Sequence, residues 1–384
     1  MELLQQRLQE VAEFFANNDT VLGYRKLMDR AMDTQDMSIY KEVIALTDWR
    51  ENNLNNDTEF ISKCIVVLEK IAAIPIDVCD TTKALIQAGD VTKIYGSSGF
   101  MLGPISLSIR KGNVYGLVGE NGNGKTTLLR ILAQELSYSQ GTLDYGFNPP
   151  ISDSFKLKTK LVYIPQRTAT WYGSLKDNLK FVLSNYGIDP EENETRVLMM
   201  IARLGLWNYK HLKWSELSSG YKMRFELART LLRQPELLLL DEPLANLDVL
   251  AQQVILEDLK SICNSINNPI ALILSSQQLY EVEKVSDKVI YLKNGKYTEN
   301  ENNPEQQQSL QLIVELDCDC DRSTLLETFK DLPLEKLVFN GGVYLAYFNE
   351  GAAFYNVLEL LGKNRVKVTY ARDISASTRR FFVS

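Results

Sequence analysis

The chain has 384 residues, of which 45% are hydrophobic and 24% are charged, and its formal net charge is −7 at pH 7. This length and composition are typical of an ordered globular protein with roughly two or three domains. The negative charge and the lack of a run of lysines and arginines argue against nucleic acid as a direct partner, because phosphate binding needs clustered positive charge.

Targeting and metal signals are weak. The N-terminus, MELLQQRLQEV, has no basic segment followed by an apolar one, so we expect no signal peptide. Glu69 and Lys70 interrupt the longest apolar candidate, so the sequence predicts no membrane-spanning helix. The five cysteines have no repeating spacing, which is typical of a reducing cytoplasm. Cys318 and Cys320 are too few for a zinc site, and His211, the single histidine, is far away in the sequence.

The first part of the chain, residues 1–85, has the apolar spacing of helices. Leu4, Leu8 and Val11 recur at three- and four-residue intervals, and the Asp-Thr pair at 57–58 can cap a later amphipathic run. We predict an N-terminal helical accessory domain over residues 1–85. A small bundle that packs on itself or on its neighbour is favoured over a dedicated ligand site, because such apolar stripes usually form core.

From about Gln87 the pattern changes to short β-rich runs that are mostly separated by helical segments. This alternation predicts an α/β domain with a largely parallel sheet over residues 86–298. The polar stretch from Tyr297 to Gln308 is typical of a linker.

The last part, residues 309–384, has the order strand, helix, strand, strand, helix, strand, with a turn at Asn340-Gly341-Gly342. This order predicts a C-terminal α+β, ferredoxin-like (βαββαβ) accessory domain. We expect a regulatory, dimerising or docking module, because none of its residues has a catalytic pattern. The tail that contains Arg379, Arg380, Phe381 and Phe382 could dock a partner or pack on this module.

A phosphate-binding loop lies in the central domain. The segment GLVGENGNGKTTLLRILA contains Gly119-x-x-x-x-Gly124-Lys125-Thr126 between a strand-like and a helix-like stretch, which is the context of a P-loop. Successive backbone N–H groups and the helix N-terminus would surround the phosphates of ATP, Lys125 would reach the β- and γ-phosphates, and Thr126 would bind Mg²⁺. The predicted nucleotide-binding residues of this loop are Gly119, Asn121, Gly122, Asn123, Gly124, Lys125, Thr126 and Thr127.

An acidic pair follows a buried strand. In LLLLDEP, Leu237 to Pro243, four leucines precede Asp241 and Glu242. Ligands bind at the carboxyl ends of the strands in open α/β sheets. We therefore predict that Asp241 holds the Mg²⁺ shell and that Glu242 activates a water molecule for attack on the γ-phosphate.

With these motifs in order, the sequence resembles the ATP-binding cassette (ABC) ATPases, a P-loop NTPase fold, over about residues 87–297. SELSSGYKMRFELARTLL, from Ser215, resembles the signature sequence of that family, YIPQ ends in the matching Q-loop glutamine, and LANLD matches the D-loop. The resemblance adds the expected site residues Tyr95 (adenine stacking), Gln166 (Mg²⁺ and water), Ser218 and Gly220 (γ-phosphate) and Asp248 (D-loop).

The resemblance also implies partners. The chain has one P-loop and one signature sequence, and in the family the signature binds the γ-phosphate held by a second cassette. The resemblance therefore implies a dimer, most simply a homodimer with two ATP molecules. The resemblance also implies separate membrane-spanning transporter subunits. This chain would then be peripheral on the cytoplasmic inner face of the cell membrane. Trp171 and Tyr172 lie near Gln166, where such cassettes dock a transporter, although ordinary loop packing explains them equally well.

The sequence departs from the family pattern at three positions. Ser219 replaces a glycine and Tyr221 replaces a glutamine, while Ser218 and Gly220 remain. Gln277 stands where the family has a histidine that contacts the γ-phosphate. A glutamine amide can donate to a phosphate oxygen but cannot carry a positive charge. ATP hydrolysis is therefore expected with Glu242, Gln277 and Lys125 as catalytic residues, either at a normal rate or slowly.

The leading hypothesis is the ATP-binding and ATP-hydrolysing subunit of an ABC transporter, an exporter by resemblance to single-cassette export ATPases. The alternative is a soluble ABC ATPase that acts as an ATP-timed interaction protein with weak hydrolysis. Translation factors of the ABC-F type are disfavoured because they carry two cassettes. Chromosome-maintenance ATPases are disfavoured because their long coiled-coil insert is missing between the P-loop and the signature.

Overall fold

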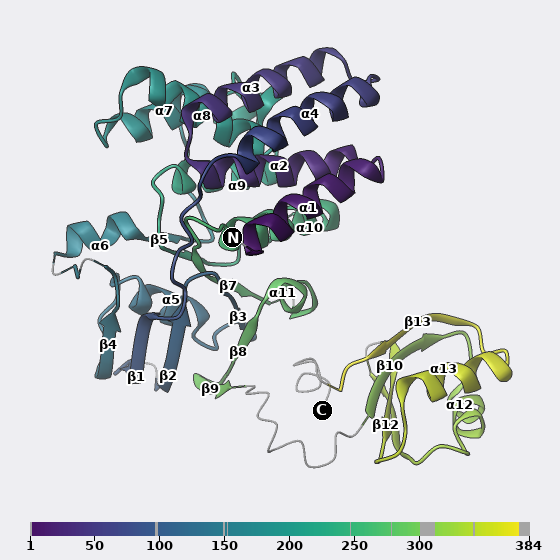
Figure 1. Cartoon of the computed structure of the whole chain (residues 1–384). Helices are drawn as coiled ribbons and strands as arrows, with labels where there is room; N and C mark the ends of the chain where they lie inside the picture. The colour runs from purple at the N-terminus through teal and green to yellow at the C-terminus, as the bar shows by residue number, and fades with distance from the viewer. Residues whose placement is uncertain are drawn as a thin grey trace. The chain divides into compact units, whose positions relative to one another are not determined.

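The computed structural model describes residues 2–96, 99–148, 150–151, 153–245, 247–277, 279–299, 312–340 and 342–375 (Figure 1). Contacts divide the chain into two compact units, residues 1–297 and residues 298–384. The predicted linker is wrong at its start, because Tyr297 to Glu299 belong to strand β9 (Lys296–Glu299). The rest of the predicted linker and the arginine- and phenylalanine-containing tail lie outside the described residues. Within the described residues, no helix has both the length and the apolar character needed to cross a membrane.

Four helices form the N-terminal part of the first unit (Figure 1): α1 (Glu2–Ala16), α2 (Thr20–Thr34), α3 (Met37–Asn52) and α4 (Asp57–Ala72). Side chains cap three of them, because Asp19, Asp36 and Asn56 accept hydrogen bonds from the first-turn N–H groups of α2, α3 and α4. The prediction of Asp57 or Thr58 as the cap of α4 is wrong by one residue. Asn56 accepts from the Glu59 N–H, and Asp57 is already the first helical residue.

Two sheets form the rest of this unit. The smaller sheet is antiparallel, with strands in the order β2 (Met101–Arg110), β1 (Ala84–Ile94), β4 (Gln140–Tyr145). The larger sheet pairs β5, β6, β7, β3 and β8 in parallel. Its strand order is β5 (Leu161–Ile164), β6 (Leu237–Leu240), β7 (Ala271–Ser276), β3 (Val114–Val118), β8 (Lys288–Lys293), β9 (Lys296–Glu299).

The strands β3, β6 and β7 are buried at every residue, as expected for parallel strands covered on both faces. The fold is therefore α/β with a mostly parallel central sheet, as predicted. The helices of this part are α5 (Lys125–Leu132), α6 (Ser154–Lys160), α7 (Leu175–Ser184), α8 (Pro190–Arg203), α9 (Ser219–Leu231), α10 (Val249–Cys263) and α11 (Leu279–Val285), with short 3₁₀ turns at Trp207–Tyr209 and Trp214–Glu216.

A cluster of buried ion pairs and hydrogen bonds, here called the buried joint, connects α2 to α8 and α10 of the α/β part. The Arg203 guanidinium, from the end of α8, donates to Asp29 on α2 and to Asp258 on α10. Ser261 also donates to Asp29. Burial alone would raise the pKa of Asp29, but the Arg203 charge and these hydrogen bonds together lower it. Asp29 is therefore ionised and paired inside the interface.

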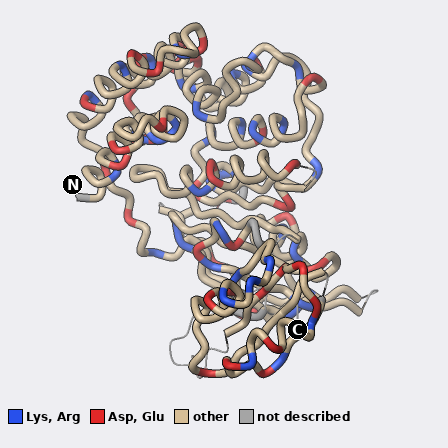
Figure 2. The backbone as a smooth tube through the Cα atoms, turned by 90° about the vertical axis from the view of Figure 1, so that its right-hand side faces the viewer, with Lys and Arg blue, Asp and Glu red and all other residues tan. Residues whose placement is uncertain are grey.

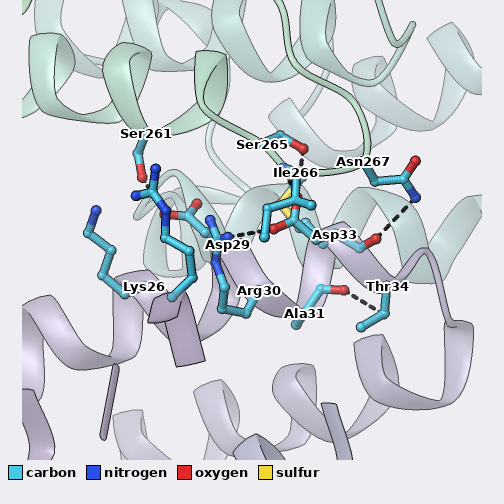
Figure 3. Close-up of polar contacts among 12 residues, drawn as sticks. Lys26, Asp29, Arg30, Ala31, Asp33, Thr34, Ser261, Ser265, Ile266 and Asn267 are labelled. Carbon is cyan, nitrogen blue, oxygen red and sulfur yellow. Dashed lines mark hydrogen bonds and ion pairs between the residues drawn. The ribbon is translucent and has the colours of Figure 1, made fainter. Parts of the chain in front are cut away.

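The joint continues one turn along α2. The carboxylate of Asp33 accepts from the Ser265 hydroxyl at 2.6 Å and from the Ile266 N–H at 3.0 Å, and the Asn267 amide donates to the Asp33 carbonyl at 3.1 Å. Figure 3 shows α2 facing the end of α10 and the turn after it through these contacts. Residues 2–72 are thus packed directly against the α/β part of the same unit.

The second unit has one four-stranded antiparallel sheet in the order β11-β12-β10-β13. Its elements are β10 (Leu312–Cys318), α12 (Arg322–Thr328), β11 (Leu334–Asn340), β12 (Val343–Phe348), α13 (Phe354–Lys363) and β13 (Val368–Asp373). The order of these strands and helices along the chain is the one predicted.

Figure 2 shows Lys and Arg interspersed with Asp and Glu along the chain.

Replacing Arg203 with methionine would leave the Asp29 carboxylate buried without its cation. We expect Arg203→Met to lower the free energy of unfolding by about 3–5 kcal/mol, measured by urea denaturation. Lys41→Met is the matched control, because Lys41 pairs with Glu191 across the same two parts but both side chains are exposed. It should change the free energy by less than about 1 kcal/mol. Equal effects of the two substitutions would contradict the importance of the buried joint.

Candidate functional site

The P-loop connects β3 to α5 and depends on glycines at two close approaches. A Cβ atom at Gly119 would lie 2.4 Å from the Leu292 carbonyl oxygen, so no larger residue fits there. Gly124 caps α5 with φ +98°, and a Cβ there would lie 2.7 Å from a Leu102 methyl carbon. Glycine at both positions therefore lets the loop pack closely against Leu292 and Leu102 of the protein.

A pocket of about 480 Å³ opens above this loop. It gathers the end of β1, the P-loop, the loop after β5, the acid after β6 and the residue after β7. Ten predicted site residues line it: Tyr95, Asn121, Gly122, Gly124, Lys125, Thr126, Thr127, Gln166, Glu242 and Gln277. The structure therefore brings together residues that lie up to 182 positions apart in the sequence, as Tyr95 and Gln277 do.

Six predicted residues do not line this pocket. Gly119 and Asp241 lie beneath it, since Lys125 donates to the Gly119 carbonyl and Thr126 to the Asp241 carboxylate. The Asn123 side chain accepts from the Asn294 N–H at 2.9 Å, so it anchors the loop to the β8–β9 turn. The remaining three are Ser218, Gly220 and Asp248.

Lys125 is buried and directed into the loop. Its Nζ donates to the Gly119 carbonyl oxygen at 2.6 Å and lies 3.3 Å from Glu242 Oε1. The ammonium thus neutralises the acid opposite it across the pocket. Phosphate oxygens entering the loop would offer this cation stronger, charged acceptors than a backbone carbonyl.

Three hydroxyl groups hold the Asp241 carboxylate. Thr126 Oγ1 donates to Oδ2 at 2.8 Å, the Tyr163 hydroxyl donates to the same oxygen at 3.1 Å, and Ser275 Oγ donates to Oδ1 at 2.7 Å. Burial and the Asp241 charge raise the pKa of Tyr163, so its hydroxyl remains a donor. Asp241 is buried, at 4% exposure, and the three hydrogen bonds fix the orientation of its carboxylate.

The donor set fits Mg²⁺. This hard cation takes oxygen ligands, usually one or two carboxylates together with waters and substrate phosphates. Asp241 and Thr126 supply such oxygens 2.8 Å from each other beside the pocket. Gln166, whose amide oxygen is a further candidate ligand, lines the same space. Among the described residues no cluster of three His, Cys, Asp or Glu could hold a metal, so a cation here would need phosphate oxygens to complete its shell.

Glu242 has a strained backbone. Its φ is +51°, in the left-handed region that residues other than glycine rarely adopt. The Ser275 hydroxyl, which donates to Asp241, accepts from the Glu242 N–H at 2.8 Å. Ser275 therefore fixes both acids at once. Strain of this kind costs about 1–3 kcal/mol and persists where the surroundings impose it, typically at functional sites.

The signature-like segment begins α9. Ser218 caps this helix by accepting from the Tyr221 N–H, and Asp248 caps α10 by accepting from the Ala251 N–H. A Cβ at Gly220 would lie 3.4 Å from Ala251, so the two helix starts are adjacent. The departure at Tyr221 has a local reason, since its ring packs on Tyr209 with centroids 3.9 Å apart.

The two aromatics after Gln166 differ in environment. Trp171 packs against α9, where its indole N–H donates to Glu226 at 2.7 Å and Arg229 lies over its ring. Ordinary packing therefore explains Trp171. Tyr172 is 88% exposed and remains available as a contact residue.

Sequence reasoning missed Phe100, Tyr163 and Ser275. Phe100 lines the pocket beside Tyr95, with ring centroids 6.3 Å apart. Tyr163 is in the quoted YIPQ motif, but nothing local indicates that it reaches Asp241. Ser275 lies on β7, and only the pairing of β7 with β6 places it beside the acids.

Comparisons with known proteins agree with this geometry. A family model described as "ABC transporter" matches residues 102–245. An uncharacterized ABC transporter ATP-binding protein from Methanocaldococcus jannaschii is 31% identical over 218 residues, which are 56% of this chain and 76% of the relative. The solved structure of cbiO1 from Clostridium perfringens, part of the ABC transporter complex cbiONQ, matches with a TM-score of 0.52 and 25% identity, covering 56% of this chain and 87% of that chain.

The names of the relatives include resistance and import proteins. The linearmycin resistance ATP-binding protein LnrL of Bacillus subtilis is 30% identical and covers 55% of this chain and 67% of the relative. The methionine import ATP-binding protein MetN 2 of Oceanobacillus iheyensis is 27% identical and covers 62% of this chain and 73% of the relative.

Removing the Ser275 hydroxyl should loosen both acids. We expect Ser275→Ala to lower the kcat of ATP hydrolysis by about 10- to 100-fold through misplacement of Glu242. The KM for ATP should change little, because the P-loop contacts remain. Ser275→Thr, which keeps the hydroxyl, is the control and should recover part of the loss. Weaker Mn²⁺ binding in the presence of a non-hydrolysable ATP analogue, followed by electron paramagnetic resonance, would report the Asp241 effect separately. An unchanged kcat in a folded Ser275→Ala protein would contradict this role.

Proposed function

The chain belongs to the ABC transporter ATP-binding proteins, and from that premise we propose that it binds Mg-ATP, dimerises and hydrolyses ATP to drive separate membrane-spanning subunits. The observation that carries the proposal is the pocket that unites the P-loop, Glu242, Gln166 and Gln277. We propose three functional parts: a helical accessory domain (1–85), the ATPase domain (86–298) and a ferredoxin-like accessory domain (309–384).

ATP binding would begin with the phosphates. The backbone N–H groups around Gly122 and Gly124 and the start of α5 favour anions, and Lys125 would exchange the Gly119 carbonyl for phosphate oxygens. Tyr95 and Phe100 line the same pocket, and their aromatic character suits stacking on the adenine. Mg²⁺, when bound by Thr126 and Asp241, would neutralise phosphate charge.

For hydrolysis, Glu242 would accept a proton from the attacking water. Its strained φ and its N–H bond to Ser275 set the carboxylate direction. The movement of Lys125 toward phosphate would release Glu242 from its 3.3 Å ion pair, which leaves the acid available as a base. Gln277, exposed at the end of β7, would donate its amide to the γ-phosphate.

A second cassette would complete the site. Ser218, Gly220 and Asp248 do not line the pocket of their own chain, and the first two stand at the start of α9. Ser218 and Ser219 are exposed, and an exposed helix N-terminus suits the phosphates of a nucleotide held elsewhere. This arrangement supports a dimer, most simply of two copies.

We further propose that the dimer lies on the inner face of the cell membrane and works as an exporter. Exposed Tyr172, next to the Q-loop, suits docking to a membrane subunit. The export direction is supported by the resemblance to single-cassette export ATPases and by the likeness to a resistance protein. Transport in vesicles decides it, because an import protein is also similar.

The second candidate function is an ATP-timed interaction protein that does not transport. Two features favour it. Gln277 is uncharged where the family has a histidine, and two accessory parts flank the ATPase domain. It differs from the first candidate in two measurements: stable ATP-dependent dimers with very slow turnover, and the lack of a membrane partner.

The role of Gln277 is tested by removing its amide. If the amide stabilises the transition state, Gln277→Ala should lower kcat by about 10²–10³-fold, with little change in KM because ground-state contacts persist. Gln277→His should equal or exceed the wild-type kcat, since it restores a donor that can carry charge. Equal rates for all three proteins would show that residue 277 points away from the nucleotide.

The transporter assignment is tested by trapping the ATP-bound state with Glu242→Gln. We expect this variant to capture a polytopic membrane protein, in near-stoichiometric amount, from native membranes in mild detergent with Mg-ATP. Mass spectrometry identifies the partner. The control is Glu242→Gln combined with Lys125→Ala, which should not bind ATP and should capture much less. Recovery of soluble partners alone would contradict transport and support the timed interaction protein.

A further inference from the structure

Two thiols meet at one end of the C-terminal sheet. Cys318 is the last residue of β10, and Cys320 follows two positions later. Cys320 lies in the bend that follows the strand. Both side chains pack against the core of the second unit and are half-buried. Their sulfur atoms are 3.0 Å apart.

The backbone explains this closeness. The register between β10 and β13 shifts between Asp317 and Cys318, and the Asp319 N–H then bonds to the Lys367 carbonyl at 3.0 Å. The strand therefore ends in a bend, which draws the two side chains toward each other. A disulfide needs about 2.05 Å between its sulfurs, so closure requires a movement of roughly 1 Å.

We propose that Cys318 and Cys320 form a reversible dithiol–disulfide pair, a modification site in the C-terminal unit that reacts with low-molecular-weight disulfides such as oxidised glutathione. The Cys320 thiolate attacks one sulfur of the oxidant and releases one glutathione thiolate. The Cys318 sulfur then gives up its proton and attacks the mixed disulfide on Cys320, which releases the second glutathione. Two protein thiols are oxidised and one glutathione disulfide is reduced.

The order of these two steps follows from the surroundings. Burial, together with the neighbouring Cys320 thiol, raises the pKa of Cys318 to about 12. Its sulfur thus stays protonated near neutral pH and is a poor first nucleophile. Once Cys320 carries the mixed disulfide, the adjacent Cys318 sulfur attacks within the same chain, where its effective concentration is high.

The other cysteines lack this arrangement. Cys64 and Cys263 are buried at 0% and 1% exposure, and burial raises the pKa of both thiols. Cys79 is partly exposed, and its sulfur donates to the neighbouring Asp80 carbonyl at 3.8 Å. It can form a mixed disulfide, but the sulfur–sulfur contact found among the described residues is that of Cys318 with Cys320.

The bond should be reversible rather than structural. A loop of about three residues restricts the unfolded chain very little, so closure adds little stability. A disulfide that departs from relaxed geometry is also more easily reduced. The pair would therefore be a dithiol in a reducing cytoplasm and would respond when that environment becomes oxidising.

The test uses the full-length protein in buffers with increasing ratios of oxidised to reduced glutathione. Acid quenching, alkylation of the remaining thiols, intact mass and peptide mapping then report the state of each cysteine. We expect the peptide that contains residues 318 and 320 to lose two hydrogen atoms, and reduced glutathione to reverse the loss. Cys318→Ser should instead retain one glutathione on Cys320. Cys79→Ser is the matched control and should not alter formation of the pair.

Two results would overturn the proposal. One is glutathione on both Cys318 and Cys320, which would show that the sulfurs do not resolve each other. The other is a fully reduced pair under conditions that modify Cys79. Neither of these mass-spectrometric results depends on ATP hydrolysis or on a membrane partner.

Discussion

The buried carboxylate of Asp241 is the constraint on which the site depends. The hydroxyls that hold it come from Tyr163 on β5, Ser275 on β7 and Thr126 after β3. β5 and β7 flank β6, which precedes Asp241, and β3 is the next strand after β7. The sheet order is therefore what assembles the site, and a slip of one residue on β7 would turn Ser275 away from both acids. A buried carboxylate without donors would be strongly destabilising.

The N-terminal helices share in this framework through α10. That helix begins at the Asp248 cap and carries Asp258 and Ser261 into the joint with Asp29. A helix transmits displacement along its axis because its backbone hydrogen bonds resist stretching. A partner cassette that contacts Asp248 would therefore press on a helix whose other end is fixed by buried charges.

Local motifs made much of the site predictable from the sequence. The P-loop, Asp241 and Glu242 are short local patterns whose chemistry depends on neighbouring residues. The structure brings the P-loop and Glu242 to one pocket, and Asp241 lies beneath it, bonded to Thr126. Ser275 and Tyr163 could not be found this way, because their role arises from strand pairing. The Arg203–Asp29 contact joins residues 174 positions apart, so the amphipathic pattern of α2 left open whether the bundle packs on itself or on its neighbour. Asn123 shows the converse: a residue within a binding motif whose side chain serves the loop itself.

The charge balance of the pocket supports the proposal that a second chain completes the site. Among the described residues that line it, Lys125 is the only cation, while Glu120 and Glu242 are acids. Gln277 adds a dipole but no charge. The triphosphate of ATP would bring several negative charges, which Lys125, the loop N–H groups and Mg²⁺ offset only in part. We propose that part of the remaining stabilisation comes from a second copy, whose α9 N-terminus, with Ser218 and Ser219 exposed, would face the phosphates. Gln277 is neutral where the family has a histidine. The dependence of ATP binding on a second copy should therefore be stronger than in a cassette whose histidine carries a positive charge.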